Sequence, residues 1–221
     1  NIRTFVFYLL SCNLSEIITV GFASAINAPL PILPMQILFL NLVTDVFPAL
    51  ALGVGESGPY IMDHPPRQKT EALLTRRHWA RLLGYGLVMS AAVLLGFAIA
   101  MLVFETDVKR AVTVSFLVLA GAQVGHVFNM VAPRSGFCIN EVTRNPWIWG
   151  AFILCVGLLA AAVYVPILSE VLGTEEPGAA GWMLVLTLSL APVLVGQTLR
   201  AISQIRRKYG RQLGVGRGES V

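Results

Sequence analysis

Six apolar stretches, each long enough to cross a lipid bilayer, constrain this sequence more than any other feature. They cover roughly residues 2–26, 32–52, 79–104, 111–132, 147–168 and 182–202. A bilayer core needs about 20 apolar residues per helical span, and in lipid only a helix satisfies its own backbone hydrogen bonds. We therefore predict an all-α membrane protein, a bundle of six transmembrane helices that occupies residues 1–202.

The composition supports this placement in lipid. Of the 221 residues, 56% are hydrophobic and only 13% are charged, whereas soluble domains carry about 25% charged residues. No large soluble domain fits beside the membrane helices in a chain of this length. The sequence begins at Asn1 and has no signal peptide, so we expect it to start artificially or to be cut from a longer chain.

Cysteine content and net charge argue against two other classes of protein. The three cysteines, Cys12, Cys138 and Cys155, are an odd number with no metal-ligand spacing, and we predict that they serve as small hydrophobic residues. A net charge of +4 could indicate nucleic-acid binding. Basic residues at the ends of membrane helices set topology instead, so we expect membrane lipid and no nucleic acid as a partner.

The distribution of lysine and arginine predicts the orientation of the bundle. One side carries only Lys109 and Arg110, together with most of the acidic loop residues. The positive-inside rule then puts both chain ends in the cytosol, with residues 203–221 as a basic cytosolic tail that suits anionic lipid. The short loops favour a bacterial plasma membrane. The predicted cytosolic side carries Arg3, Arg67, Lys69, Arg76, Arg77, Arg81, Arg134, Arg144, Arg200, Arg206, Arg207, Lys208, Arg211 and Arg217.

Two carboxyl groups fall within stretches that are predicted to span the lipid bilayer. Glu16 falls near the middle of the first apolar stretch, and Asp45 falls inside the second. A charged side chain at the bilayer centre costs about 2.5–3.5 kcal/mol on insertion scales. Nothing basic lies in the interior of either stretch to pair with them. We therefore expect a cation, a proton or a hydrated cavity to compensate these carboxyl groups.

The neighbours of the two carboxyl groups favour a cation. Asn13 lies three residues before Glu16, and Asn41 and Thr44 precede Asp45 at helical spacing, so each set shares one helix face. Two such faces on consecutive helices can converge and offer carboxylate, amide and hydroxyl oxygens, which hard cations such as calcium prefer. Pro48 is expected to break the second helix and free backbone carbonyls, as in midplane ion sites of transporters.

The fourth apolar stretch adds one further candidate ligand, Gln123. Gly121 and Gly125 form a GxxxG pattern, which allows close helix approach and could bring Gln123 towards the first two helices. His126 follows on the same stretch, and we predict that it is a packed or pore-edge histidine rather than a ligand.

Three motifs in register resemble the P2-type cation-transporting ATPases. Residues 11–16 (Ser-Cys-Asn-Leu-Ser-Glu) look like the fifth transmembrane helix of that family, and residues 41–45 (Asn-Leu-Val-Thr-Asp), followed by Pro48 and Ala49, look like the sixth. Residues 61–67 (Ile-Met-Asp-His-Pro-Pro-Arg) resemble the loop that joins the sixth and seventh helices. The resemblance implies a six-helix bundle equivalent to helices five to ten of a P-type ATPase.

The resemblance to calcium pumps of the sarcoplasmic-reticulum type implies a ligand set. Asn13, Glu16, Asn41, Thr44 and Asp45 match ion-coordinating positions, and Gln123 stands where those pumps have a glutamate. It also implies that a loop contacts the cytosolic phosphorylation domain, through Asp63, Pro65, Pro66 and Arg67.

The family's phosphorylation motif, Asp-Lys-Thr-Gly, does not occur in this sequence. Mg²⁺ and ATP are therefore expected only in phosphorylation and nucleotide-binding domains of a parent chain, and this fragment contains no catalytic residue. Calcium is the favoured cargo, and manganese, sodium, potassium and protons remain open. Two alternatives also remain open: a secondary cation or proton transporter that uses the same carboxyl groups, and a membrane module without transport.

Overall fold

The computed structural model describes residues 2–54, 74–131 and 140–215, and side chains up to residue 203 and at residue 205. Within these residues, six helices are long and apolar enough to cross a membrane, so the predicted all-α bundle is confirmed. The segments that cross are Ile2–Ala25, Pro34–Val54, Arg76–Leu102, Val108–Asn129, Pro146–Tyr164 and Gly178–Ser203.

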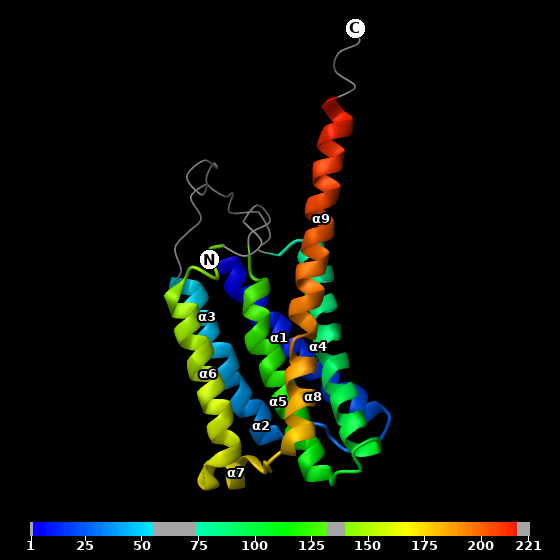
Figure 1. Ribbon diagram of the computed structural model, residues 1–221, viewed down its shortest axis with the longest axis vertical. Helices are drawn as coiled ribbons and strands as arrows, with labels where there is room; N and C mark the ends of the chain where they lie inside the picture. The colour runs from blue at the N-terminus through cyan, green and yellow to red at the C-terminus, as the bar shows by residue number, and fades with distance from the viewer. Residues whose placement is uncertain (1, 55–73, 132–139, 216–221) are drawn as a thin grey trace.

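Several of these segments consist of more than one helical piece. In chain order the pieces are α1 (Ile2–Ala25), α2 (Pro34–Leu40), the π-helical turn η1 (Asn41–Asp45), α3 (Val46–Val54), α4 (Arg76–Leu102), α5 (Val108–His126), the 3₁₀ turn η3 (Val127–Asn129), α6 (Pro146–Tyr164), α7 (Pro166–Leu172), α8 (Gly178–Ser189) and α9 (Ala191–Val215). The helices run side by side, and α9 extends beyond the others at the end where α1 begins (Figure 1).

Helix α5 forms the centre of the bundle. In its most apolar window 83% of residues are buried, against 17% for the segment Gly178–Ser203. The predicted GxxxG pattern packs α5 against α8 and α9, because a Cβ atom on Gly121 would lie 2.8 Å from the Ser189 Cβ and one on Gly125 would lie 3.1 Å from Val193. Gln123 is about 200° further round the helix from Gly121, so it faces the opposite side, towards α1.

The last two spans differ from the sequence expectation. The fifth was expected to continue to residue 168, but α6 ends at Tyr164 because Pro166 lacks a backbone N–H and holds Val165 in an extended conformation. The sixth was expected to be one helix over residues 182–202 and is two, α8 and α9, that meet around Leu190 shortly before Pro192. Helix α9 also continues through Val215, past the expected start of the tail at residue 203.

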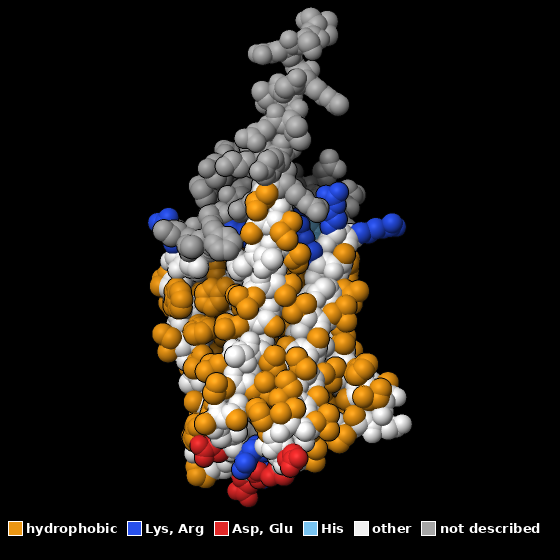
Figure 2. Space-filling view, turned by 45° about the vertical axis from the view of Figure 1, so that its right-hand side comes forward, with side chains coloured by type: hydrophobic (Ala, Val, Ile, Leu, Met, Phe, Trp, Pro, Cys, Tyr) orange, Lys and Arg blue, Asp and Glu red, His pale blue; other side chains and the backbone are white. Residues whose placement is uncertain are grey.

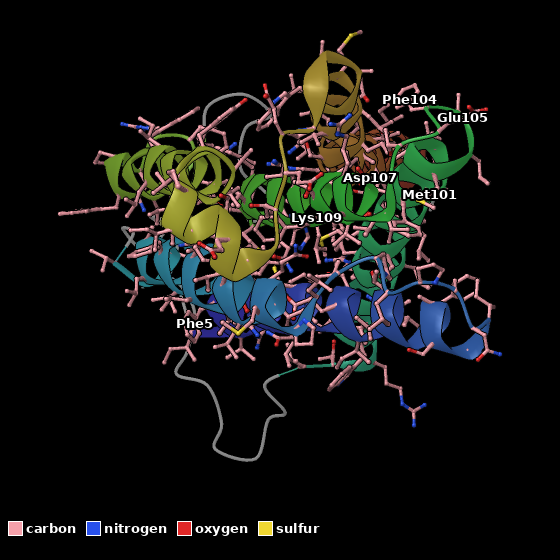
Figure 3. The ribbon with its side chains drawn as sticks, turned by 90° about the horizontal axis from the view of Figure 1, so that it is seen from below. Phe5, Met101, Phe104, Glu105, Asp107 and Lys109 are labelled. Carbon is pink, nitrogen blue, oxygen red and sulfur yellow. The ribbon has the colours of Figure 1, made fainter. Side chains whose placement is uncertain are left out.

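Charged side chains gather at the two ends of the bundle, and an apolar band lies between them (Figure 2). Acidic residues dominate the lower end, where Lys109 pairs with Glu175 at 3.0 Å. Seen from below, Glu105 lies towards the edge of the bundle after the end of α4, and Asp107 and Lys109 lie nearer its middle at the start of α5 (Figure 3). Charged side chains therefore lie at the two ends of the bundle, at the levels where the membrane surfaces would be.

Candidate cation site

The two carboxyl groups predicted from the sequence lie inside the bundle. Glu16 on α1 and Asp45 in η1 are each only 5% exposed. The Asn13 side-chain amide donates to Asp45 Oδ2 at 3.0 Å, and the Gln123 side-chain amide donates to Glu16 Oε1 at 3.0 Å. Neither group therefore faces acyl chains or bulk solvent.

Gln123 connects the two carboxyl-bearing elements. The Thr44 hydroxyl lies within hydrogen-bond distance of two acceptors, Gln123 Oε1 at 2.6 Å and the Leu40 carbonyl at 2.9 Å, and the shorter contact makes Gln123 Oε1 the acceptor of its single proton. A continuous set of hydrogen bonds thus runs from Glu16 through Gln123 to Thr44, whose neighbour Asp45 is bonded back to Asn13 on α1. The structure brings these five predicted residues from α1, η1 and α5 into one polar layer.

Two acceptor atoms in this layer have no hydrogen-bond donor. They are Asn41 Oδ1 and Asp45 Oδ1, both buried. A buried polar group left without a partner costs about 1–3 kcal/mol, and a bound cation would remove that cost at both atoms. Asn41, the sixth predicted residue, lies in the same turn as Asp45 and likewise has a buried oxygen without a donor among the described residues.

The groups that could coordinate an ion suit a hard cation. It comprises the carboxylates of Glu16 and Asp45, three side-chain amides and the Thr44 hydroxyl, and Ca²⁺ takes 6–8 oxygen ligands. Within the described part of the chain, no three His, Cys, Asp or Glu side chains group to hold a metal by themselves. Amide and hydroxyl oxygens would therefore have to complete the coordination.

The turn that carries Thr44 and Asp45 is π-helical, and single π turns are common at functional sites. The break was expected at Pro48, but Pro48 lies within α3 and the irregular turn comes before it. Pro48 has no N–H to donate to the Thr44 carbonyl; the Tyr8 hydroxyl donates there instead, at 2.7 Å. The Cys155 thiol similarly donates to the Val43 carbonyl at 3.3 Å.

Sequence reasoning missed Tyr8 and the surroundings of Cys12. The Tyr8 hydroxyl also lies 3.2 Å from the Gln123 carbonyl, where the helix tightens into the 3₁₀ turn η3. Cys12, predicted as a small hydrophobic residue, is fully buried and its thiol lies between the Tyr8 hydroxyl and the Asp45 carboxylate. Its position one helical turn before Glu16 was the available signal.

His126 lies in an aromatic environment. It is fully buried, its ring stacks on Tyr8 at 6.1 Å and contacts Tyr85 at 4.4 Å, and its Nδ1 lies 3.2 Å from the Asn129 amide. These contacts describe a packed histidine. The predicted coupling loop, with Asp63, Pro65, Pro66 and Arg67, lies outside the described residues, as does Cys138.

The described residues thus form a helical bundle of membrane-spanning length with two carboxyl groups in a buried, oxygen-rich layer. The family model described as "Cation transporting ATPase, C-terminus" matches residues 29–202. The chain belongs to this family.

Relatives with curated names extend the comparison. A "Calcium-transporting ATPase" of Bacillus subtilis is 33% identical over 195 residues, which cover 88% of this chain and 22% of the relative. "Calcium-transporting ATPase 1" of Bacillus cereus is 27% identical over 215 residues, covering 90% and 24%. An endoplasmic reticulum-type "Calcium-transporting ATPase 4" of Arabidopsis thaliana is 24% identical over 263 residues, covering 95% and 25%. The chain thus spans about a quarter of the length of these relatives.

Proposed function

We propose that this chain is the ion-binding transmembrane portion of an ATP-driven pump that transports calcium. Asn13, Glu16, Asn41, Thr44, Asp45 and Gln123 hold the ion. The observation that carries the proposal is the buried layer in which two carboxyl groups and two donor-free oxygens meet. Membership of the cation-transporting ATPase family, and relatives named as calcium-transporting ATPases, support a pump and this cargo.

The proposed mechanism assigns binding to this chain and energy supply to the rest of the parent protein. Phosphorylation and nucleotide-binding domains of the same parent chain would use ATP and Mg²⁺, and their motion would open the site alternately to either side. Glu16 and Asp45 bind the cation in one state and are protonated or exposed in the other. The residues Asp63, Pro65, Pro66 and Arg67 would transmit the motion.

The proposed orientation has both chain ends in the cytosol of a bacterial cell, with the bundle in the plasma membrane lipid. The basic residues at the end where α1 begins support it, because positive charge is retained on the cytosolic side. The acidic end with Glu105, Asp107 and Glu175 would face outwards.

A secondary cation or proton transporter is the alternative that uses the same carboxyl groups. The parent reading frame distinguishes the two classes. An Asp-Lys-Thr-Gly motif a few hundred residues upstream supports the ATPase, and a complete upstream frame without it would favour the secondary transporter.

The direct test measures ATP hydrolysis by the purified full-length parent across a panel of cations. We expect stimulation by Ca²⁺ and its loss in Asp45→Asn. Ser90→Ala is the matched control, because the Ser90 hydroxyl is buried and donates to the Ser15 backbone carbonyl rather than to a side chain of the polar layer. Stimulation by sodium or potassium but not by calcium would overturn the assigned cargo. Full calcium stimulation in Asp45→Asn would overturn the assigned site.

A further inference from the structure

Cys12 places a sulfur atom beside the buried Asp45 carboxylate. It is fully buried on α1, and its thiol contacts the Asp45 carboxylate on one side and the Tyr8 hydroxyl on the other. Hard cations such as Ca²⁺ prefer oxygen, whereas thiolate sulfur prefers softer metals such as Zn²⁺. The thiol is therefore unnecessary for calcium and changes which other cations the pocket can hold.

A second observation points to a metal at the same place. Asp45 Oδ1 is buried without a donor, and the same holds for Asn41 Oδ1 in the same turn. Asp45 is only 5% exposed, so its free oxygen faces the protein interior, where the Cys12 thiol also lies. The Cys12 sulfur and the Asp45 carboxylate that it contacts are a two-point anchor for a borderline or soft divalent cation.

We propose that the cation site also takes a thiophilic divalent cation, of the class of Zn²⁺ and Cd²⁺, through the Cys12 sulfur and the Asp45 carboxylate. The proposal rests on the proposed function, because it concerns the same pocket. Binding forms a metal–sulfur bond, breaks the thiol S–H bond and releases that proton to water. The Asn41 oxygen is the next available ligand. Such a cation competes with calcium for Asp45.

Cys155 provides a matched control within the same region. Its thiol is buried and donates to the Val43 carbonyl at 3.3 Å, so it lies against the backbone of the π turn. Replacing either cysteine by serine removes one sulfur atom and keeps a hydroxyl donor. The two variants therefore differ in whether the lost sulfur lay against a carboxylate.

The first experiment titrates the purified full-length parent with Cd²⁺ and follows the ultraviolet absorbance of the cadmium–thiolate bond. We expect Cys12→Ser to lose one equivalent of this absorbance and Cys155→Ser to keep it. Saturating Ca²⁺ should remove the same equivalent from the unmodified protein. Persistence of the full absorbance in Cys12→Ser would overturn the proposal. Should that variant not fold, undiminished absorbance of the unmodified protein in saturating Ca²⁺ would overturn it equally.

The second experiment measures inhibition of calcium-dependent ATP hydrolysis by Cd²⁺. Cys12→Ser should need at least about tenfold more Cd²⁺ for half-inhibition than the unmodified protein, because the sulfur ligand is gone, and Cys155→Ser should not differ. Equal sensitivity of the two variants contradicts the proposal. An absence of calcium stimulation, with a Cys12-dependent cadmium absorbance still present, would overturn the proposed pump and leave the thiol site standing.

Discussion

Among the described residues, two of the candidate membrane segments are interrupted close to a proline, and only one of the interruptions lies beside the buried carboxyl groups. The segment Pro34–Val54 contains the π turn Asn41–Asp45 before Pro48, and the segment Gly178–Ser203 breaks around Leu190 before Pro192. In its most apolar window the first is 44% buried and the second 17%. A proline-associated break is therefore insufficient evidence for an ion site.

The two breaks differ in what surrounds them. At the second break, the Asn129 amide donates to the Pro192 carbonyl at 2.8 Å, and the Gln197 amide donates to the Phe128 carbonyl at 3.3 Å. These two hydrogen bonds connect α9 to the turn η3, which follows α5. Residues 185–200 contain no acidic residue. At the first break, Asp45 faces Asn13 and keeps one oxygen without a donor. The two breaks therefore differ in the presence of a buried carboxylate oxygen without a donor among the described residues, because the buried oxygens without a partner at the second break belong to the amides of Asn129 and Gln197.

The largest expected effect comes from replacing one glutamine near each break by leucine, Gln123 near the first and Gln197 near the second. Gln123→Leu removes the hydrogen bonds to Glu16 and Thr44. Thr44 keeps the Leu40 carbonyl as an acceptor, whereas Glu16 Oε1 loses the amide that donates to it in a buried layer. We expect the calcium affinity of the full-length parent to fall about 100-fold, since losing one partner of a buried charged hydrogen bond costs 2–5 kcal/mol. Calcium-dependent ATP hydrolysis measured against free calcium concentration reports the affinity.

Gln197→Leu is the control for that measurement, because Gln197 is half-buried and bonds only to a backbone carbonyl. Its calcium affinity should stay within about twofold of the unmodified protein. An equal loss in both variants would remove the distinction between the two breaks.

The next largest effect concerns the side chains that donate hydrogen bonds to the backbone carbonyls of the π turn. Tyr8→Phe removes the hydroxyl that donates to the Thr44 carbonyl at 2.7 Å in a fully buried position. We expect a loss of about 2 kcal/mol in the free energy of unfolding, because a buried carbonyl is left unsatisfied. Cys155→Ala removes only a weak thiol donor and should cost less. Denaturant titration of the purified protein in detergent compares them, and a larger loss in Cys155→Ala would contradict this ranking.

Much of this arrangement could be predicted from the sequence. The length of the apolar stretches fixes six helices, and the cost of Glu16 and Asp45 in lipid identifies the residues that need compensation. Helical spacing then adds Asn13, Asn41 and Thr44 to the same faces.

The π turn could not be predicted in the same way. Its backbone carbonyls find donors on Tyr8 and Cys155, which are 36 and 112 residues away from the residues they bind. Local sequence contains Pro48, which predicts a freed carbonyl four residues earlier at Thr44, but it does not contain the partners that bind the carbonyls of the turn. The environment of Cys12 depends on the same tertiary contacts.

A smaller effect tests whether the proline maintains the turn. Pro48→Ala restores a backbone N–H that can donate to the Thr44 carbonyl and compete with Tyr8. We expect a more regular helix, a displaced Asp45 and a fall of about fivefold in calcium affinity, a loss of roughly 1 kcal/mol. Pro192→Ala at the other break should leave calcium affinity unchanged. A stronger effect of Pro192→Ala on calcium-dependent ATP hydrolysis would show that both breaks take part in binding.

The smallest expected effect comes from the hydroxyl at the second break. The Ser189 hydroxyl donates to the Leu186 carbonyl at 3.2 Å, and Ser189 packs against Gly121. Among the described residues, it makes no hydrogen bond to a carboxyl group. Ser189→Ala should change the free energy of unfolding by less than about 0.5 kcal/mol and leave calcium affinity unaltered. Thr44→Val is its counterpart in the polar layer, because it removes the 2.6 Å contact with Gln123. A calcium affinity that falls in Ser189→Ala but not in Thr44→Val would reverse the assignment of the two breaks, since the proposed ligands include Thr44 and its neighbour Asp45 but no residue of the second break.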